Sequence, residues 1–367
     1  MSPQLEVQLL AAIVAAACAL PGVFLVLRRT AMISDAISHT ILFGIVIGFL
    51  LVNDIESPWL LVGATLTGVL TVWLVELVTR TGLVKEDTAI GLIFPLLFSL
   101  AVIAISRFAA NAHLDVDAVL LGEIAFAPFD RLTILGIDLP RGIWITGTIL
   151  LANLLMIGLF YKELKLSTFD AGLAAALGFS PVLLHYGLMT MVSLTAVGSF
   201  DAVGSILVIA LMIGPPAAAY LLTDRLSLML GLSVLIGVIS AIAGYWLARW
   251  IDTTIAGAMA TMVGISFGLV FLLAPQRGML AVVRRQGRQR WEFAQQMLTA
   301  HLLHHEGQPE ALEESQIEHL ISHLRWNGDF AGQVVRRAEQ AGLVRCEGHI
   351  LQLTEQGRAL ASEAMTR

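Results

Sequence analysis

The chain has 367 residues, of which 57% are hydrophobic and only 14% are charged, and its mean hydropathy is +0.81. Because soluble proteins carry about 25% charged residues, this composition excludes an ordinary soluble globular protein. The charge is unevenly distributed: residues 1–290 hold 16 Lys and Arg with 17 Asp and Glu, whereas residues 291–367 hold 6 and 11. The sequence therefore predicts a large membrane part followed by a small soluble tail.

Nine apolar runs follow one another in the first three quarters of the chain. Each has about 20 residues, enough at a rise of about 1.5 Å per residue to cross a hydrocarbon core of about 30 Å. The runs are residues 7–27, 36–52, 58–78, 88–106, 142–161, 183–200, 202–222, 227–248 and 254–274. The boundary at residues 198–201 is the least distinct: a tight loop there gives two spans, and an irregular piece of a broken helix gives one. The predicted fold class is an all-α polytopic membrane protein with eight or nine transmembrane helices.

Lys and Arg in the connections predict the orientation, since cytoplasmic loops are enriched in both. With the amino terminus outside, the inner connections hold seven of these residues and the outer ones four, and residues 277–290 add five arginines on the inner side. We therefore expect the carboxyl end in the cytoplasm and acidic outer connections, which carry Asp54, Glu56, Asp115, Asp117, Glu123, Asp130 and Asp138. Such a surface can gather cations, although ordinary solvation is the simpler interpretation.

Residues 162–182 interrupt the membrane pattern with charged residues, a short helix, and then Gly178 and Pro181. Ser167 or Thr168 is expected to cap that helix, and Asp170 to complement its amino-terminal dipole. A short cytoplasmic helix between spans suits docking to another protein. The pattern alone fits a plain amphipathic connector equally well.

Ionisable side chains inside a span cost about 2.5 to 3.5 kcal/mol on insertion scales, which makes each one a candidate for function. Asp35 and His39 stand four residues apart at the start of the second run, so they share a helix face, with Ser38 beside them. A carboxylate and an imidazole one turn apart can share a divalent cation of borderline softness, such as Mn, Fe or Zn. The alternative is an Asp–His pair that satisfies itself near the membrane interface.

Other polar residues give weaker indications. Asp201, just ahead of the run 202–222, is either a second ligand or the cap of that helix. Three features are interpreted as structural: His113 with Asp115 and Asp117 as solvated surface, His185 as an interfacial anchor, and Glu76 as a side chain that reaches the inner interface.

The sequence carries no phosphate-binding loop of the Walker A type. That loop needs a lysine directly after a glycine, whereas the three lysines, Lys85, Lys162 and Lys165, follow Val84, Tyr161 and Leu164. No catalytic residue is predicted, so the chain is not expected to be an enzyme. Any ATP has to be hydrolysed by a partner subunit docked on the cytoplasmic side.

Five stretches resemble the membrane permeases of manganese/zinc/iron ABC importers of the ABC-3 type. They are RRTAMISDAISHTILFGIVIGFLL (28–51), GLIFPLLFSLAVIAISR (91–107), HLDVDAVLLGEIAFAP (113–128), KELKLSTFDAGLAAALGFSP (162–181) and FDAVGSILVIALMIGPPAAAYLLTDRL (200–226). The resemblance covers about residues 5–275. It implies a bacterial inner-membrane permease that works in pairs, with an ATP-binding subunit below and an extracytoplasmic metal-binding protein above. Manganese is the first expectation for the transported ion, with zinc or iron as alternatives, and no permanently bound cofactor is expected.

The same resemblance assigns roles to particular residues. It implies that Asp35 and His39 are ligands on the metal pathway, and it extends this role to Asp201. The loop motif around His113 and Asp115 resembles the manganese/iron branch. The segment 162–182 becomes the expected coupling region to the ATP-binding subunit, through Phe169, Asp170, Ala175, Leu177 and Gly178.

The tail, residues 291–367, follows a basic linker expected at 277–290 and reads as three helices and a hairpin, closing with TEQGRALASEAM. Gly342 is expected to stop a helix, and Glu347-Gly348 to form a two-residue turn between short strands. This order predicts a winged helix (α+β). AGLVRCEGHILQLTEQGRALA (341–361) resembles the DNA-binding domain of diphtheria-toxin-repressor-type metalloregulators.

Charge argues against nucleic acid as the partner of the tail, because its net charge is −5 and only Arg325, Arg336 and Arg337 lie near the expected recognition helix. Six of the nine histidines lie in the tail. His319 and His323, at i and i+4, form a possible metal-sensing pair; a solvated or packed histidine face is the alternative.

Three functions thus follow from the sequence. An import permease is preferred. A membrane-tethered, metal-responsive DNA-binding regulator is the second, disfavoured because nine spans exceed what an anchor needs. A proton-coupled metal transporter is the third, and co-purification with an ATPase separates it from the first.

Overall fold

The computed structural model describes residues 2–54, 57–108, 124–134, 136–308, 312, 315–316, 319 and 323–366. These residues form two compact units, residues 1–278 and 279–367, and each is described by itself. Residues 279–290 were expected as part of a linker. They form instead the first part of a helix that runs from Met279 to His305.

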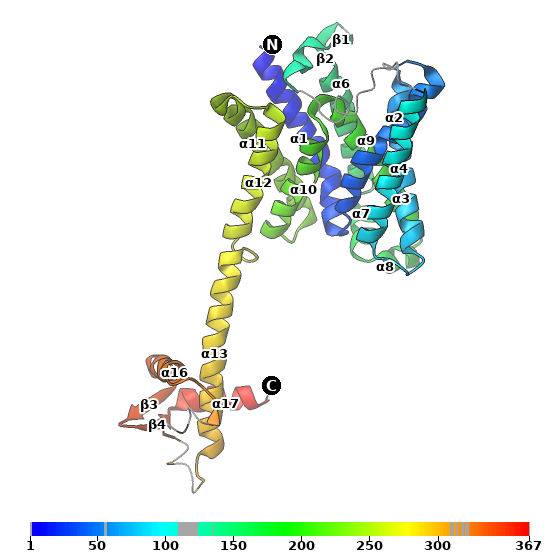
Figure 1. Ribbon diagram of the computed structural model, residues 1–367. Coiled ribbons are helices and arrows are strands. Elements are labelled where there is room, and N and C mark those ends of the chain that lie inside the picture. The colour runs from blue at the N-terminus through cyan, green and yellow to red at the C-terminus, as the bar shows by residue number, and fades with distance from the viewer. Residues whose placement is uncertain are drawn as a thin grey trace. The chain divides into compact units, whose positions relative to one another are not determined.

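The first unit is a helical bundle (Figure 1). Nine of its described helices are long and apolar enough to cross a membrane, so the described residues hold nine candidate spans, the larger of the two expected numbers. They are α1 (Pro3–Leu27), α2 (Met32–Val52), α3 (Pro58–Thr79), α4 (Glu86–Phe108), α6 (Arg141–Leu159), α9 (Pro181–Val203), α10 (Ser205–Leu222), α11 (Leu226–Ile251) and α12 (Ile255–Leu273).

Shorter elements join these spans. The 3-10 helix η1 (Ile124–Phe129) and the strands β1 (Arg131–Ile134) and β2 (Ile137–Pro140) precede α6, and α7 (Tyr161–Phe169) and α8 (Ala171–Ala176) follow it. Strands β1 and β2 pair antiparallel, with Arg131 opposite Pro140 and Ile134 opposite Ile137.

The break between α9 and α10 lies at Gly204, not at residues 198–201. Gly204 has a φ of +80°, a conformation that favours glycine. Gly198 is instead a packing position inside α9, because a Cβ there would stand 2.2 Å from Cδ1 of Ile149 on α6. The position where a turn was expected is therefore a site of close contact between α9 and α6.

Close backbone approach holds the bundle together at several glycines. A Cβ on Gly22 of α1 would stand 2.0 Å from the carbonyl oxygen of Met212 on α10. A Cβ on Gly44 of α2 would stand 2.3 Å from the carbonyl oxygen of Gly63 on α3. Apolar side chains gain little from leaving lipid, so small residues that let helices touch are the usual means of association in a membrane. These contacts fix α1 against α10 and α2 against α3.

Hydrogen bonds inside the bundle add to this packing. Asn153 on α6 is fully buried, and its amide donates to the carbonyl of Ala17 at 3.1 Å and to the hydroxyl of Thr195 at 2.9 Å. Thr71 on α3 donates to Thr40 on α2 at 2.8 Å. Such bonds contribute about 0.6 to 1.7 kcal/mol each in membrane proteins, and here they join α6 to α1 and α9, and α3 to α2.

The second unit contains α13 (Met279–His305), α16 (Gly328–Gln340), the hairpin β3 (Val344–Glu347) and β4 (Ile350–Leu353), and α17 (Glu355–Thr366). Its core joins Leu298 and Leu302 of α13 to Val334 of α16, with Val344 and Leu351 from the hairpin. Gly342, at φ +69°, follows the end of α16 as expected.

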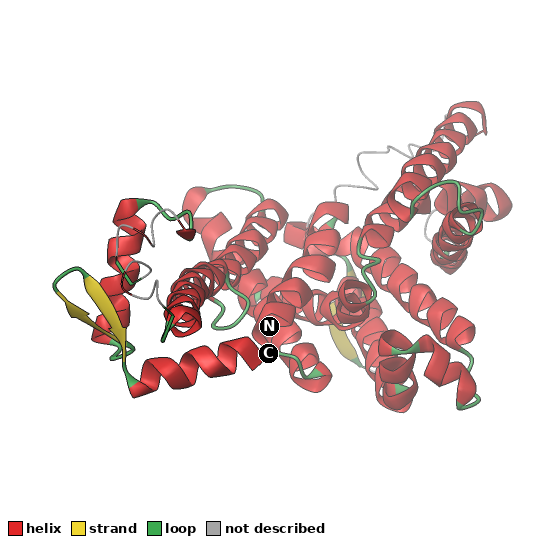
Figure 2. Ribbon diagram, turned by 90° about the horizontal axis from the view of Figure 1, so that it is seen from below, coloured by secondary structure: helices red, strands yellow, loops and turns green. Residues whose placement is uncertain are grey.

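The turn of the β3–β4 hairpin was misplaced by one residue. Glu347 pairs with Ile350, so the two turn residues are Gly348 and His349, with Gly348 at φ +69°. In the described part of the chain the strands form only two separate hairpins, drawn in yellow in Figure 2. The unit thus has a helix–hairpin–helix order, and this small sheet alone does not establish a winged helix.

Candidate functional site

Asp35 and His39 lie on the first two turns of α2. Oδ1 of Asp35 is 3.7 Å from Nε2 of His39. Two donors bound to one ion at about 2.1 Å each are about 3 to 4 Å apart, so this pair needs little adjustment to share a metal. The side chains are 42% and 35% exposed, so one copy of the chain leaves both open to a ligand or to another helix.

The surroundings of the pair restrict what else joins it. The His39 ring lies 5.3 Å from the ring of Phe94 and 6.5 Å from that of Phe98, both on α4. Ser38 is buried, and its hydroxyl donates to the backbone carbonyl of Ser34 at 2.7 Å. The donors that this face offers are therefore one carboxylate and one imidazole beside an aromatic wall.

Asp201 is exposed in the last turn of α9 and does not cap α10, whose cap position is Gly204. Arg28 binds His185 near the start of α9, so the start of α2 and the start of α9 lie at the same end of the bundle. Asp201 is 16 residues beyond His185 along α9, a rise of about 24 Å. Asp201 and Asp35 therefore stand at opposite ends of the span and do not bind one ion together.

The expected coupling residues form an elbow between α7 and α8. Asp170 caps α8: its Oδ1 accepts from the backbone N–H of Leu173 at 2.8 Å. Phe169 and Leu177 are 61% and 60% exposed, Ala175 is exposed, and Gly178 turns the chain at φ +87°. Buried Leu164 and Ala174 anchor the elbow, so it presents apolar side chains outward on a fixed base.

Ser167 and Thr168 do not cap α8. Both bind Arg28, which directly follows α1: the guanidinium donates to Oγ of Ser167 at 3.0 Å and to Oγ1 of Thr168 at 3.1 Å. It also reaches Nδ1 of His185 at 3.2 Å. Burial lowers the pKa of Arg28, but arginine starts so high that it stays charged. Arg28 thus ties the elbow to α1 and α9.

The contacts continue from His185 to α3. Because arginine is only a donor, Nδ1 of His185 accepts, and the proton of the neutral ring is on Nε2. Nε2 lies 2.7 Å from Oε1 of Glu76, whose Oε2 accepts from Tyr186 at 2.8 Å and from Arg80 at 3.2 Å. Sequence reasoning treated Glu76 and His185 as separate interfacial side chains and did not single out Arg28. The available signal in the sequence was an arginine directly after a span.

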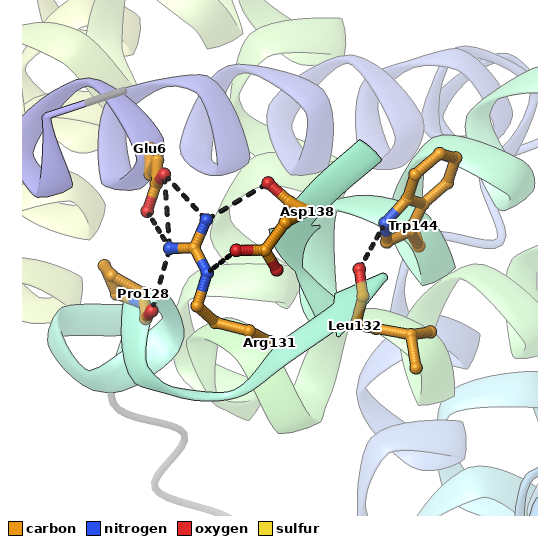
Figure 3. A network of polar contacts seen from close by, with 6 residues as sticks. All are labelled: Glu6, Pro128, Arg131, Leu132, Asp138 and Trp144. Atoms are coloured by element: carbon orange, nitrogen blue, oxygen red, sulfur yellow. Dashed lines mark hydrogen bonds and ion pairs between the residues drawn. The ribbon is translucent and has the colours of Figure 1, made fainter. Parts of the chain in front are cut away.

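At the other end of the bundle, Arg131 on β1 joins the hairpin to α1 (Figure 3). Its guanidinium lies 3.1 Å from Oε2 of Glu6, a side chain only 2% exposed, and 2.8 Å from Oδ2 of Asp138. Hydrogen bonds to Glu6 and then Asp138 raise the pKa of Arg131. Asp138 thus shares the guanidinium of Arg131 with Glu6, and this ion-pair network holds β1 and β2 against α1.

Several residues discussed from the sequence fall outside the described residues. They are the loop cluster His113, Asp115 and Asp117, and the acids Glu56 and Glu123 of the expected outer connections. In the second unit, His319 and His323 have ring centroids 5.3 Å apart, but His323 also approaches His301 and His305 of α13. Arg337, one of the three arginines near α16, lies over the ring of Trp291 at 4.1 Å, so packing engages it.

The fold and these sites define a multi-pass membrane protein with a metal-type donor pair inside one span. Residues 4–275 match the ABC 3 transport family, and the chain belongs to that family. It is therefore a membrane transport subunit and not an enzyme.

Two curated relatives and one solved structure illustrate the family. The chain is 49% identical over 357 residues to the zinc transport system membrane protein TroD of Treponema pallidum, covering 97% of each chain. It is 47% identical over 269 residues to the manganese transport system membrane protein MntD of Bacillus subtilis, covering 73% of this chain and 91% of MntD. PsaBC from Streptococcus pneumoniae in complex with Fab matches with a TM-score of 0.63 at 26% identity, over 77% of this chain and 95% of that one. The match to TroD therefore extends over the second unit, whereas the match to MntD leaves most of that unit uncovered.

Proposed function

We propose that the chain is the permease subunit of an ABC importer for a divalent transition-metal ion. The observation that carries this is the Asp35–His39 pair: two donors 3.7 Å apart, each about 40% exposed, inside a span of a transport-family protein. An unpaired carboxylate facing lipid is costly, so a pair left open in this way indicates a polar pathway on this face of α2.

The pathway is completed by a second permease subunit, a copy of this chain or a close relative. Two donors from one chain are too few to hold an ion firmly, and two from each of two chains give a shared, exchangeable site. Weak ligation suits transport, since a closed four-ligand cage holds its ion. An extracytoplasmic metal-binding protein then delivers the ion to the outer mouth.

ATP is hydrolysed by a separate ATP-binding subunit docked on the α7–α8 elbow. Phe169, Leu177 and Ala175 provide its apolar contact, while Asp170 and Gly178 fix the shape of the elbow. Arg28 transmits movement of the elbow to the start of α2, because it binds Ser167 and Thr168 and precedes Asp35 by only seven residues. In this proposal the elbow and the carboxyl end lie in the cytoplasm, and the chain is a bacterial inner-membrane protein.

Manganese or zinc is the proposed cargo, with iron third. The relatives' names support the first two equally: TroD is described as a zinc and MntD as a manganese transport protein. An O,N donor pair suits all three ions, and affinity alone favours zinc over manganese. Supply and geometry therefore decide the ion that is carried.

The test is metal uptake by the reconstituted importer carrying Asp35→Ala with His39→Ala. We expect uptake to fall to background at unchanged expression, because both pathway donors are removed. The control is Asp130→Ala, which removes an exposed acid outside the spans. Uptake that continues undiminished in the double variant would refute the proposal.

For the second unit we propose a cytoplasmic regulatory role. Its order of α16, hairpin and α17 is the order of a winged helix, and this supports the predicted likeness to metalloregulators. Its net negative charge and the engagement of Arg337 with Trp291 favour regulation by an ion over DNA binding.

A further inference from the structure

Three histidines of the second unit come together although 18 residues separate two of them. His301 and His305 stand at i and i+4 on α13, and His323 precedes α16. One nitrogen from each ring can be chosen so that all three lie within 4.8 Å of one another. The ring centroids are 4.8 Å apart for His301 and His305, and 5.5 Å for His301 and His323.

We propose that His301, His305 and His323 form a binding site for Zn²⁺. This site differs from the pair that the sequence predicted, His319 and His323, because the second and third ligands come from α13. It is also separate from the membrane pathway, and its existence does not depend on which ion the permease carries.

The donors are suited to a late transition-metal ion. Imidazole nitrogen suits Zn²⁺, Cu²⁺ and Ni²⁺, whereas Mg²⁺ and Ca²⁺ prefer oxygen, and Mn²⁺ binds weakest among the first-row ions. The neighbouring acid, Glu306, is bound by Arg358 through hydrogen bonds of 2.6 and 3.1 Å, so it is not available as a fourth ligand. Three imidazoles without thiolate or carboxylate favour zinc with water in the fourth position.

The geometry is close to that of a bound site. Tetrahedral zinc with bonds of about 2.0 to 2.1 Å needs nitrogens about 3.3 Å apart, so rotation of the side chains from separations within 4.8 Å is sufficient. Nδ1 of His305 is buried and has no hydrogen-bond partner among the described residues. A buried polar atom without a partner is costly, and an ion satisfies it.

The consequence is a link between two segments of the chain. Zinc bound by α13 and by the segment before α16 holds these two parts of the chain together. The first is the helix that begins the second unit, and the second leads into the expected recognition helix. A three-ligand site open to water exchanges its ion more readily than a closed four-ligand site, as a sensor requires.

The test measures zinc bound to the full-length protein in detergent after equilibrium dialysis. The background carries Asp35→Ala and His39→Ala, so that the membrane pair contributes no ion and failure of the transport proposal does not affect the result. We expect one zinc ion per chain, and affinity at least about tenfold weaker in His301→Gln or His323→Gln, since even removal of supporting groups costs that much. His349→Gln, at an exposed turn of the same unit, is the control and should bind normally.

A second variant separates ligation from folding. His323→Cys should keep zinc bound, and with Co²⁺ it should add a thiolate-to-cobalt charge-transfer band that the parent protein lacks. Absence of that band, or zinc lost in His319→Gln but kept in His301→Gln, would overturn the proposed ligand set.

Discussion

Single side chains at the end of the bundle that holds Arg28 decide how the α7–α8 elbow is attached. Arg28 is a donor to Ser167 and Thr168, and its contact with His185 fixes that ring's proton on the nitrogen facing Glu76. The guanidinium thereby links α1 to α7 and α9, and His185 extends the network to α3. Lysine in its place would be a point charge without the planar fork, so the substitution is not conservative.

In the second unit, a surface ion pair makes one contact dependent on pH. The guanidinium of Arg358 on α17 lowers the pKa of Glu306, which directly follows α13. A carboxylate with a lowered folded-state pKa stabilises the fold above its unfolded value of about 4.3 and loses this effect as pH falls through the folded value.

We therefore predict that the docking of α17 weakens as pH is lowered below about 4.3, and that Glu306→Gln removes this part of the pH dependence. Hydrogen exchange of the amides of residues 355–366, corrected for intrinsic rates, measures it. Glu339→Gln, an exposed acid on α16, is the control. An identical pH profile for Glu306→Gln and the parent protein would contradict the prediction.

At the scale of elements, the α7–α8 elbow is formed by local sequence and held by tertiary contacts. Asp170 caps α8 and Gly178 ends the turn, as their residue types suggest. Ser167 and Thr168 are residue types that often cap helices, but their hydroxyls accept hydrogen bonds from Arg28 instead. Sequence pattern cannot distinguish these roles, because the partner is 139 residues away for Ser167.

We predict that Phe169→Ser and Leu177→Ser each weaken binding of the ATP-binding subunit about 10- to 100-fold. Burying a Phe or Leu side chain contributes about 1.5 to 3 kcal/mol, and each 1.4 kcal/mol is tenfold in affinity. Co-purification and titration with the detergent-solubilised permease measure it. Leu83→Ser is the matched control, because Leu83 is 87% exposed in the turn after α3 at the same end of the bundle. If Leu83→Ser weakens binding equally, the elbow is not the docking site.

At the scale of the whole molecule, the chain consists of a permease unit and an added unit. The relative MntD aligns over 91% of its own length with only 73% of this chain. A protein of this family therefore does without most of the second unit, whereas the match to TroD includes it. This division is consistent with the proposal that the second unit regulates transport.

Deletion of residues 279–367 is therefore predicted to leave uptake intact and to abolish its inhibition by metal on the cytoplasmic side. The reason is that the proposed ion-binding histidines are all removed, while Asp35, His39 and the elbow remain. Uptake into vesicles loaded with increasing zinc measures this. Unchanged inhibition after the deletion would show that the second unit is not the sensor.

The sequence alone indicated eight or nine spans and most of their approximate positions, because each span must match the thickness of a membrane. It also predicted Asp35 and His39 as candidate metal ligands, since a polar pair stands out in an apolar run; their role stays a prediction. Both follow from local composition and helical periodicity.

Only the tertiary structure decided which distant residues meet. It moved the α9–α10 break to Gly204, because Gly198 is used for contact with Ile149. It joined Arg28 to the elbow, separated Asp201 from Asp35, and paired His323 with α13. These outcomes depend on how helices pack, and packing brings together residues whose separation along the chain leaves no periodic pattern.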